Sequence, residues 1–273
     1  MFPSLKIARP FGINVFLHWT FWLLPLWVIF TWDDSGIFSL AFNLLLIACL
    51  FGCVVLHELG HALTARHFGI GTRNITLSPL GGIASLERMS RNPWEEFCIA
   101  IAGPLVNVVI AALLGVLLLG GVALDPPLAA TLIGRFLITL LVLNIVMVLF
   151  NLLPVFPMDG GRVLRAILAN SMGLLQGTRV AVTVGTVVGG LMAIAGAVLF
   201  FLGQSPVLFF IAVFVIWAGY QELGALEAQE RERLEEEDSL FVQPVQSHAA
   251  VWIWDPAIRA WVRRSMSDSG RYV

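Results

Sequence analysis

The sequence predicts an all-α polytopic membrane protein with six transmembrane helices, a short membrane-associated β segment and a cytoplasmic C-terminal tail. Of its 273 residues, 58% are hydrophobic and only 12% are charged, whereas a soluble domain carries about a quarter charged residues. The apolar residues gather in runs close to the roughly 20 residues that a spanning helix needs. Lys and Arg fall almost entirely in alternate connections between these runs. These observations exclude an ordinary soluble domain.

The candidate spans are residues 12–32, 37–66, 97–121, 130–153, 180–203 and 206–221. Two cations precede the first run, as in a signal peptide, but the run continues through Trp32 and no small-residue cleavage site follows it. We therefore expect a retained transmembrane helix at this position. The last run is short and follows a tight Gly-Gln-Ser-Pro turn, so spans five and six are expected to form a hairpin.

The positions of Lys and Arg orient these spans, because cytoplasmic loops carry an excess of both residues. Fifteen of the sixteen cations fall on one side of a six-span arrangement: at the N-terminus, after spans two and four, and in the tail. The exception is Arg135, near the outer end of span four. The opposite loops, around Asp33, Asp125 and Gln204, contain none. Both termini are therefore expected in the cytoplasm.

The composition changes at residue 221 and divides the chain into a six-span membrane domain, 1–221, and a cytoplasmic tail, 222–273. The first part of the tail, through Asp238, has eight acidic residues against two arginines, which is typical of a solvated acidic helix. The last part is rich in tryptophan and arginine (Trp252, Trp254, Trp261, Arg259, Arg263 and Arg264). This mix favours a segment at the surface of anionic lipid, and a small packed or oligomerising element is the alternative.

The second span contains an HExxH motif, His57-Glu58-Leu59-Gly60-His61. Histidines four residues apart lie on one face of a helix, about 6 Å apart along its axis, so both imidazoles can reach one zinc ion. Glu58, beside them, is placed to act as a base on the attacking water. Two imidazoles and a carboxylate are costly near the edge of the hydrocarbon, so they indicate function there. The sequence therefore predicts half of a zinc site.

Such a site needs a third protein ligand, and the same helix offers two candidates. His67 has the spacing of a metzincin signature, but Thr64 replaces the glycine that would turn the chain, so the helix should continue and leave His67 about 15 Å from His57. Cys53 fails similarly, because residues 53, 57 and 61 extend over about 12 Å. One zinc ion with bonds of about 2.0–2.1 Å cannot reach across such distances. All three cysteines are expected to be packed thiols.

The better candidate for the third ligand is Asp159, which follows span four in the segment "NLLPVFPMDGGRVLR", residues 151–165. Two prolines in this segment break the helix, and a Gly-Gly pair then allows a turn. Unwound backbone at membrane depth is tolerated where it is buried in protein or lines a cavity. The arginine pattern places Asp159 on the same side of the membrane as the HExxH motif. Zinc would compensate its charge; the alternative is a role as a helix N-cap.

These segments resemble the site-2 protease family of intramembrane zinc metalloproteases. The resemblance rests on "HELGH", on "NLLPVFPMDGG", which matches the family pattern Asn-x-x-Pro-x-x-Pro-x-Asp-Gly, and on "AGPLVN" at residues 102–107. The segments "GINVFLHWTF" and "SPLGGIASLE" are also similar to family sequences. Together these motifs cover roughly residues 11–165.

The resemblance implies one zinc ion held by His57, His61 and Asp159, with Glu58 as general base and acid. It also implies that Asn151 helps to hold the substrate carbonyl or oxyanion, a role that suits an amide donor. Hydrogen bonding between helices is the alternative for Asn151.

The chain departs from many members of this family in its accessory parts. The loop at 76–96 is too short for a PDZ domain, and the tail is too short for a pair of cystathionine-β-synthase-type domains, so a short form is expected. Asn107 is interpreted as a structural residue. His18, near the cytoplasmic end of span one, is a further polar residue whose orientation relative to the site stays open.

The resemblance further implies a protease that cleaves transmembrane segments of membrane-tethered regulatory proteins. We expect residues 72–87, with their β-branched side chains and a Gly-Gly pair, to form a short hairpin to which an unwound substrate adds as a strand. The expected partners are a transmembrane protein substrate and the lipid bilayer, without nucleic acid. The sequence does not specify an oligomeric state.

Two alternatives remain open on the sequence. In the first, the chain is a different membrane zinc peptidase in which Glu87, Glu95 or Glu96 replaces Asp159 as a ligand. In the second, it is a non-proteolytic membrane protein that binds or transports metal. The presence of Glu58 argues against the second alternative, because binding alone needs no base.

Overall fold

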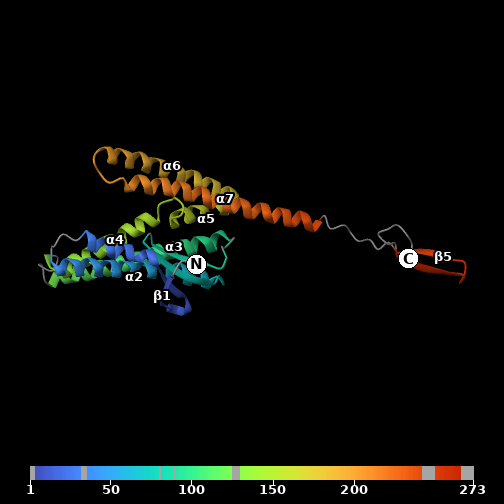
Figure 1. The fold of residues 1–273 in the computed structure, drawn as a ribbon, viewed down its shortest axis with the longest axis horizontal. Coiled ribbons are helices and arrows are strands. Elements are labelled where there is room, and N and C mark those ends of the chain that lie inside the picture. Colours follow the sequence, from blue (N-terminus) through green and yellow to red (C-terminus); the bar gives the residue numbers. More distant parts are fainter. Residues whose placement is uncertain are drawn as a thin grey trace. The chain divides into compact units, whose positions relative to one another are not determined.

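The structure, a computed structural model, describes residues 4–31, 36–79, 81–88, 90, 92–124, 130–241 and 250–265. The predicted outer loops around Asp33 and Asp125, as well as Arg91 and Arg271, lie outside the described residues. The chain separates into two compact units, Met1–Leu226 and Glu227–Val273. Figure 1 shows the elements of both units in chain order.

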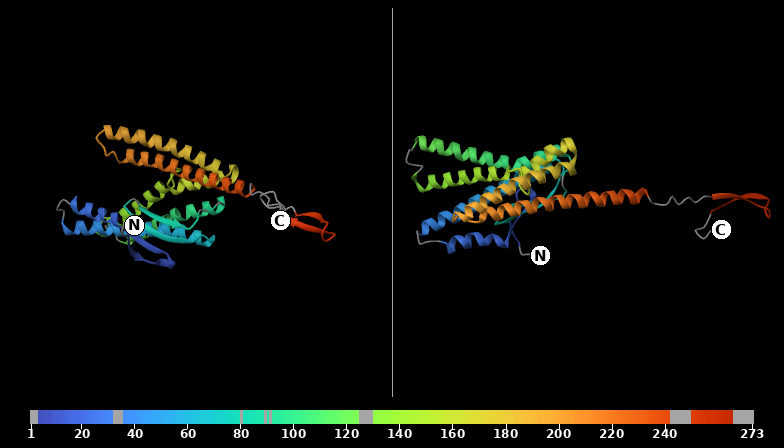
Figure 2. Two further views of the ribbon diagram at one scale, coloured as in Figure 1. Left: turned by 45° about the vertical axis from the view of Figure 1, so that its right-hand side comes forward. Right: turned by 90° about the horizontal axis from the view of Figure 1, so that it is seen from above.

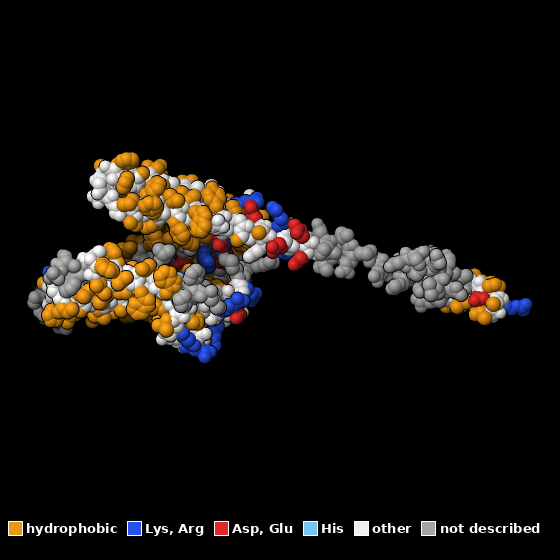
Figure 3. Space-filling model, in the orientation of Figure 1, with side chains coloured by type: hydrophobic (Ala, Val, Ile, Leu, Met, Phe, Trp, Pro, Cys, Tyr) orange, Lys and Arg blue, Asp and Glu red, His pale blue; other side chains and the backbone are white. Residues whose placement is uncertain are grey.

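Five helices within the described residues are long and apolar enough to cross a membrane: α2 (Ile37–His67), α3 (Pro93–Leu124), α4 (Leu132–Asn151), α6 (Leu174–Phe201) and α7 (Val207–Phe241). They correspond to the second to sixth predicted spans. In Figure 3, hydrophobic side chains are spread over much of the visible helical surface, as expected of helices in contact with lipid tails. A shorter helix, α5 (Asp159–Met172), lies between α4 and α6 in sequence. The chain is therefore an integral membrane protein.

The prediction of one transmembrane helix at residues 12–32 is wrong. This segment contains a strand, β2 (Asn14–His18), then a 3-10 turn, η2 (Trp19–Trp22), and a helix of eight residues, α1 (Leu23–Phe30). Burial alternates along β2, with Val15 fully buried and its neighbours partly exposed, which is the period of a strand. Mean hydropathy does not distinguish an apolar strand from an apolar helix, and this strand depends on a partner far away in sequence.

Four strands form one sheet, in the order β1-β2-β3-β4. β1 (Ser4–Ala8) pairs antiparallel with β2, β2 pairs parallel with β3 (Thr72–Ser78), and β3 pairs antiparallel with β4 (Gly81–Leu86). The predicted hairpin after α2 is thus confirmed, whereas the participation of β1 and β2 was not predicted. Buried side chains of β2 and β3 pack against α2 (Val15, Leu17, Ile75 and Leu77 against Phe51, Val54, Leu59 and Ala62). The sheet is thereby fixed against the half of α2 that carries the HExxH motif.

The helix α3 is central to the helical packing, because it contacts α2, α4 and α5. α5 in turn packs against α6. Figure 2 shows these helices in two further views. α2 and α3 approach closely at Gly60, where a Cβ atom would lie 2.8 Å from the carbonyl oxygen of Ala102. Small residues allow such close approaches between helices in membranes.

The second unit contains the C-terminal part of α7 and a two-stranded antiparallel hairpin. The strands are β5 (Ala250–Asp255) and β6 (Ala260–Ser265). The rings of Trp254 and Trp261 face each other across the strands, with centroids 5.7 Å apart. Both side chains are exposed, at 46% and 62%.

Candidate metal centre

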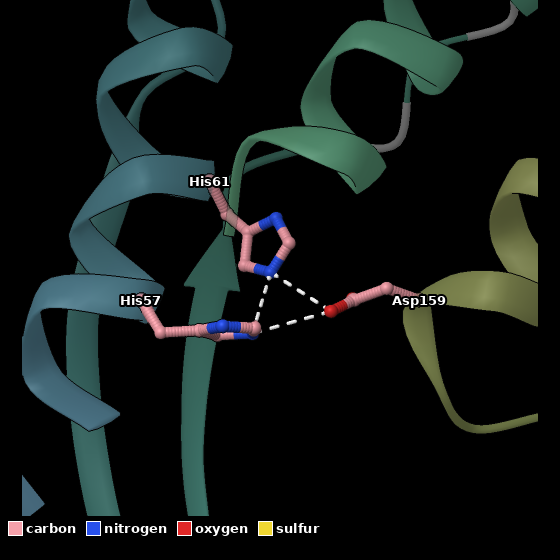
Figure 4. Close-up of side chains that lie close together, drawn as sticks. All are labelled: His57, His61 and Asp159. Atoms are coloured by element: carbon pink, nitrogen blue, oxygen red, sulfur yellow. Dashed lines mark hydrogen bonds and ion pairs between the residues drawn. The ribbon is translucent and has the colours of Figure 1, made fainter. Parts of the chain in front are cut away.

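Three side chains that could hold a metal ion meet where α2 and α5 approach each other. His57 and His61 extend from one face of α2, and Asp159 is the first residue of α5 (Figure 4). The two Nε2 atoms are 3.1 Å apart, and the Oδ2 atom of Asp159 lies 3.2 Å from the first and 3.3 Å from the second. Both histidines are buried, at 5% and 9% exposure. The structure thus brings together the three residues predicted as zinc ligands.

In each imidazole, the Nδ1 atom, which is not part of the cluster, lies at hydrogen-bonding distance from an oxygen acceptor. Nδ1 of His61 lies 2.7 Å from the carbonyl oxygen of Ile99, which can only accept, so Nδ1 carries the proton. Nδ1 of His57 lies 2.8 Å from Oδ1 of Asn107, and it likewise donates. A neutral imidazole that is protonated at Nδ1 has a lone pair at Nε2. Both histidines therefore direct a lone pair at the space that they share with Asp159.

The converging atoms have the chemistry of a cation site. Two unprotonated nitrogens and a carboxylate oxygen face one another, and Oδ2 of Asp159 is buried without a hydrogen bond from the described residues. Three acceptors at such short range repel one another unless a positive charge lies between them. Zinc bonds of about 2.0–2.1 Å in a tetrahedron place ligand atoms about 3.3–3.4 Å apart. The observed separations fit that value, and nitrogen and carboxylate ligands suit zinc.

Asp159 reaches the site because the chain unwinds after α4 and restarts as α5. The N-cap of α5 is Met158, so the alternative role of Asp159 as N-cap is not adopted. The turn is tight: a Cβ atom at Gly160 would lie 2.2 Å from the carbonyl oxygen of Leu153. A metal ion between this carboxyl group and the two imidazole nitrogens would favour the ionised carboxylate, which is the form that binds a metal.

The motif "AGPLVN" supports the site from α3. A Cβ atom at Gly103 would lie 2.1 Å from Nε2 of His61, so only glycine leaves room for this ring. Four residues later on the same helix, Asn107 binds His57. The segment thus positions both histidines: Gly103 leaves room for the ring of His61, and Asn107 accepts a hydrogen bond from His57.

Glu58, the predicted base, is half-buried and lies against the edge strand of the sheet. Its Oε2 atom accepts a hydrogen bond of 3.1 Å from the backbone N–H of Ala84, in β4. A Cβ atom at Gly82 would lie 2.6 Å from Cγ of Glu58. The glycine therefore allows β4 to approach the base closely.

Three other residues considered from the sequence lie outside the cluster that could bind a metal. α2 continues through His67, as predicted, and leaves that side chain exposed at the end of the helix. His18 caps η2, with Nδ1 2.7 Å from Oγ1 of Thr20. Asn151 is the last residue of α4, and its half-buried side chain makes no hydrogen bond to the described residues.

The glutamates that could have replaced Asp159 are engaged elsewhere. Glu96 binds Arg165, and Glu95 accepts a hydrogen bond from Ser90. The carboxylate of Glu87 packs on Gly71. None of them belongs to a possible metal cluster among the described residues. All three cysteines are free thiols, as predicted.

A buried ion triad that the sequence did not reveal connects three helices near the site. Arg165, on α5, binds Glu96 on α3 and donates to Glu222 on α7 at 2.6 Å. Its guanidinium also lies 5.3 Å from the centroid of the Phe156 ring, in the turn before Asp159. Burial would lower the pKa of Arg165, but the two glutamates raise it above its ordinary value. Arg165 therefore stays charged, and its ion pairs hold α5, the helix that begins with Asp159, against α3 and α7.

Two further buried residues were also not assigned to the site from the sequence. Asn144, on α4, binds Asn107, which had been interpreted only as structural, and Gly103 accommodates His61. For Asn144, the available signal was a polar side chain in the middle of an apolar run, which is costly in a membrane and so indicates a specific partner.

Comparison with known proteins gives consistent matches. The sequence pattern of a family described as Peptidase family M50 matches residues 45–126 and 121–195, which is more than half of the chain. A zinc metalloprotease of Methanocaldococcus jannaschii is 34% identical over 226 residues, which make up 83% of this chain and 62% of the relative. A putative zinc metalloprotease of a Synechocystis species is 35% identical over 245 residues, or 85% of this chain and 62% of the relative. The chain thus spans less than two thirds of the length of these curated relatives.

A solved structure is similar as well. The site-2 protease from Methanocaldococcus jannaschii aligns with a TM-score of 0.55 and 33% sequence identity, over 81% of this chain and 95% of that chain. The family match over residues 45–195 contains His57, His61 and Asp159, the three residues of the candidate metal site.

Proposed function

Because the chain belongs to peptidase family M50, we propose that it is an intramembrane zinc metalloprotease that cleaves transmembrane segments of membrane-tethered regulatory proteins. The observation that carries this proposal is the convergence of two imidazole nitrogens from the apolar helix α2 and a buried carboxylate oxygen from the start of α5, within 3.1–3.3 Å. The names of the relatives support zinc as the ion and peptide hydrolysis as the reaction.

His57, His61 and Asp159 would hold one zinc ion. When bound, zinc supplies a Lewis acid that activates water and polarises a substrate carbonyl. The three residues contribute two neutral ligands and one anion, so the site keeps a net positive charge that favours an anionic transition state. The Nδ1–H bonds to Ile99 and Asn107 orient the two rings for this role.

Glu58 would act first as general base and then as general acid. The carboxylate takes a proton from the attacking water and passes it to the leaving amine. The hydrogen bond from the N–H of Ala84 supports this assignment, because it directs the carboxylate toward β4. The base is therefore held at the edge of the sheet, where an extended substrate can reach it.

We propose that an unwound substrate segment pairs with β4. This strand is the last in the sheet order, and the described residues include no strand on its outer side. The N–H of Ala84 points to Glu58 rather than to β3, so the alternate residues Gly82 and Leu86 direct their backbone groups to the same open edge. A substrate strand added there gains backbone hydrogen bonds and exposes its carbonyl groups next to the base.

Asn151 would stabilise the oxyanion. It ends α4, eight residues before Asp159, and its half-buried amide has no partner among the described residues. An unengaged amide N–H next to the unwound segment is available for a developing negative charge. Exchange of Asn151 for alanine should lower kcat about 100-fold or more without loss of zinc.

We propose that both termini and the active site lie on the cytoplasmic side. The support is the distribution of Lys and Arg, because thirteen of the sixteen lie at the end of α2, in the connections after α2 and α4, in the first turns of α6, or in the tail. Lys6 and Arg9 belong to the same side, since β1 pairs with β2 and β2 pairs with β3, the strand that follows α2. On the visible face in Figure 3, blue Lys and Arg side chains also gather where Figure 1 labels β1. A fluorescent protein fused to the C-terminus should fluoresce, whereas alkaline phosphatase at the same position should be inactive. The opposite pattern would reverse the orientation.

The function is tested with purified protein in liposomes that contain a labelled transmembrane peptide. We expect cleavage by the wild type, none by Glu58→Gln at normal zinc content, and loss of zinc in Asp159→Ala. Glu235→Gln, which changes an exposed carboxylate of α7, is the matched control and should cleave normally. Cleavage by Glu58→Gln would refute the mechanism. A wild type that binds zinc but cleaves none of a broad set of membrane peptides would favour a metal-binding or transport protein.

A further inference from the structure

Two asparagines lie in the middle of apolar helices, and both are completely buried. Asn107 is on α3 and Asn144 on α4, and each has an exposure of 0%. Burial of an unpaired amide in a membrane protein is costly, so each amide should have specific partners. The partners form a continuous chain that ends at His57.

The direction of every hydrogen bond in this chain is fixed at its far end. Nδ2 of Asn144 donates to the backbone carbonyl oxygen of Leu140 at 2.9 Å, and that oxygen can only accept. Oδ1 of Asn144 is therefore turned to Asn107, whose Nδ2 donates to it at 3.0 Å. This bond in turn directs Oδ1 of Asn107 to Nδ1 of His57, at 2.8 Å.

The orientation of the amides has a chemical consequence at the ring. Because Oδ1 of Asn107 accepts, Nδ1 of His57 must carry the proton, and Nε2 keeps its lone pair. If the Asn107 amide turned over, its Nδ2 would face Nδ1 of His57 and stabilise the opposite tautomer. His57 would then present an N–H to His61 and Asp159, and an N–H cannot bind a metal.

We propose that Asn144 and Asn107 form a relay that sets the tautomer of His57, so that Asn144 is a positioning residue for a metal site that it does not touch. The proposal rests on the function proposed above, in which His57 is a zinc ligand. His61 needs no such relay, because a backbone carbonyl, that of Ile99, fixes its tautomer directly. Among the described residues, His57 has no backbone carbonyl at Nδ1. Its tautomer is fixed instead by Asn107 on α3 and Asn144 on α4.

The alternative is that the two asparagines only join α3 to α4. Hydrogen bonds between membrane helices contribute to packing, and the 3.5 Å contact from Nδ2 of Asn144 to Sγ of Cys53 also links α4 to α2. A purely structural role would change stability and leave the metal affinity of the folded protein unaltered. The two roles therefore differ in a measurable quantity.

The test compares zinc affinity in Asn144→Leu and Asn144→Asp, by competition with a chromogenic chelator. Leucine keeps the volume but gives Nδ2 of Asn107 no acceptor, so the Asn107 amide is free to turn over. A buried, neutral aspartic acid can still donate to Leu140 and accept from Asn107. We expect zinc affinity to fall about 10- to 100-fold in Asn144→Leu and to stay within about threefold of wild type in Asn144→Asp.

Cobalt substitution adds a readout of ligand geometry. The visible spectrum of the cobalt-loaded wild type and Asn144→Asp should coincide, and that of Asn144→Leu should shift or lose intensity. Thr139→Leu is the matched control and should match wild type, because Thr139 is a half-buried residue of the same helix whose hydroxyl donates to the Arg135 carbonyl oxygen and lies outside the relay. Helix content by circular dichroism verifies folding of each variant.

The outcomes separate this proposal from the one on which it rests. If His57→Ala and Asp159→Ala bind zinc like wild type, the proposed metal site itself is wrong. If these two lose zinc but Asn144→Leu, folded, keeps wild-type affinity, only the relay is overturned. Should Asn144→Leu fail to fold, ¹⁵N-histidine NMR of the zinc-free wild type decides, with the His57 signals assigned from His57→Ala. A proton on Nδ1 is the expected result, and a proton on Nε2 would overturn the relay.

Discussion

Exchange of Gly103 for alanine should disable the metal centre without removing any ligand. The added Cβ atom would lie 2.1 Å from Nε2 of His61, whereas non-bonded heavy atoms rest about 3.5 Å apart. The ring must therefore move by about 1.4 Å, or α3 must retreat from α2 by a similar distance. Metal–ligand distances tolerate about 0.2 Å, so the bond from His61 to zinc would be lost. We expect zinc affinity to fall by at least about 100-fold.

The matched control for this variant is Gly115→Ala. Gly115 is on the same helix, and a Cβ atom there would meet nothing within 4 Å, so zinc binding should equal that of wild type. Bound zinc by plasma mass spectrometry and affinity by chelator competition are measured for both variants, together with cleavage of the transmembrane peptide. Normal zinc affinity and cleavage in Gly103→Ala would refute the placement of His61 against α3.

Three more predictions concern the base, the ion triad and the metal. Gly82→Val should abolish cleavage at normal zinc content, because its Cβ atom would lie 2.6 Å from Cγ of Glu58 and displace the base; retained activity would contradict the close approach of β4 to Glu58. Arg165→Met leaves Glu96 buried at 8% exposure without its cation, so we expect a loss of about 3–5 kcal/mol in unfolding free energy in detergent, against no change in the exposed Arg231→Met. Removal of zinc should lower the unfolding temperature reversibly, since a ligand at 1,000 times its Kd stabilises by about 4 kcal/mol, and His57→Ala should show no response.

The sequence predicted the three residues of the candidate metal site because their positions follow from local rules. The spacing of His57 and His61 is a property of one helix, and the absence of a helix breaker before Gly69 excluded His67. Asp159 was predicted because it follows a helix break at membrane depth, and because the arginine pattern placed it on the same side of the membrane as the two histidines. The structure brings these residues together.

The parts that sequence reasoning missed depend on contacts between distant segments. β2 was interpreted as helix because its residues are apolar, and only its parallel pairing with β3, 60 residues further on at Asn14 and Asn74, makes it a strand. The partners of Asn107 and Arg165 lie on other helices, at separations that no periodicity reports. Local pattern thus predicts which side chains are unusual, and packing decides what they bind.

The coordination of zinc in the purified protein tests the central claim most directly. X-ray absorption at the zinc edge of the wild type should show only nitrogen and oxygen neighbours at about 2.0–2.1 Å, with the outer-shell scattering of two imidazoles. In Asp159→Ala this signal should be lost together with the bound metal. A sulfur neighbour at about 2.3 Å, as from Cys53, or full retention of the wild-type spectrum in Asp159→Ala, would contradict a site formed by His57, His61 and Asp159.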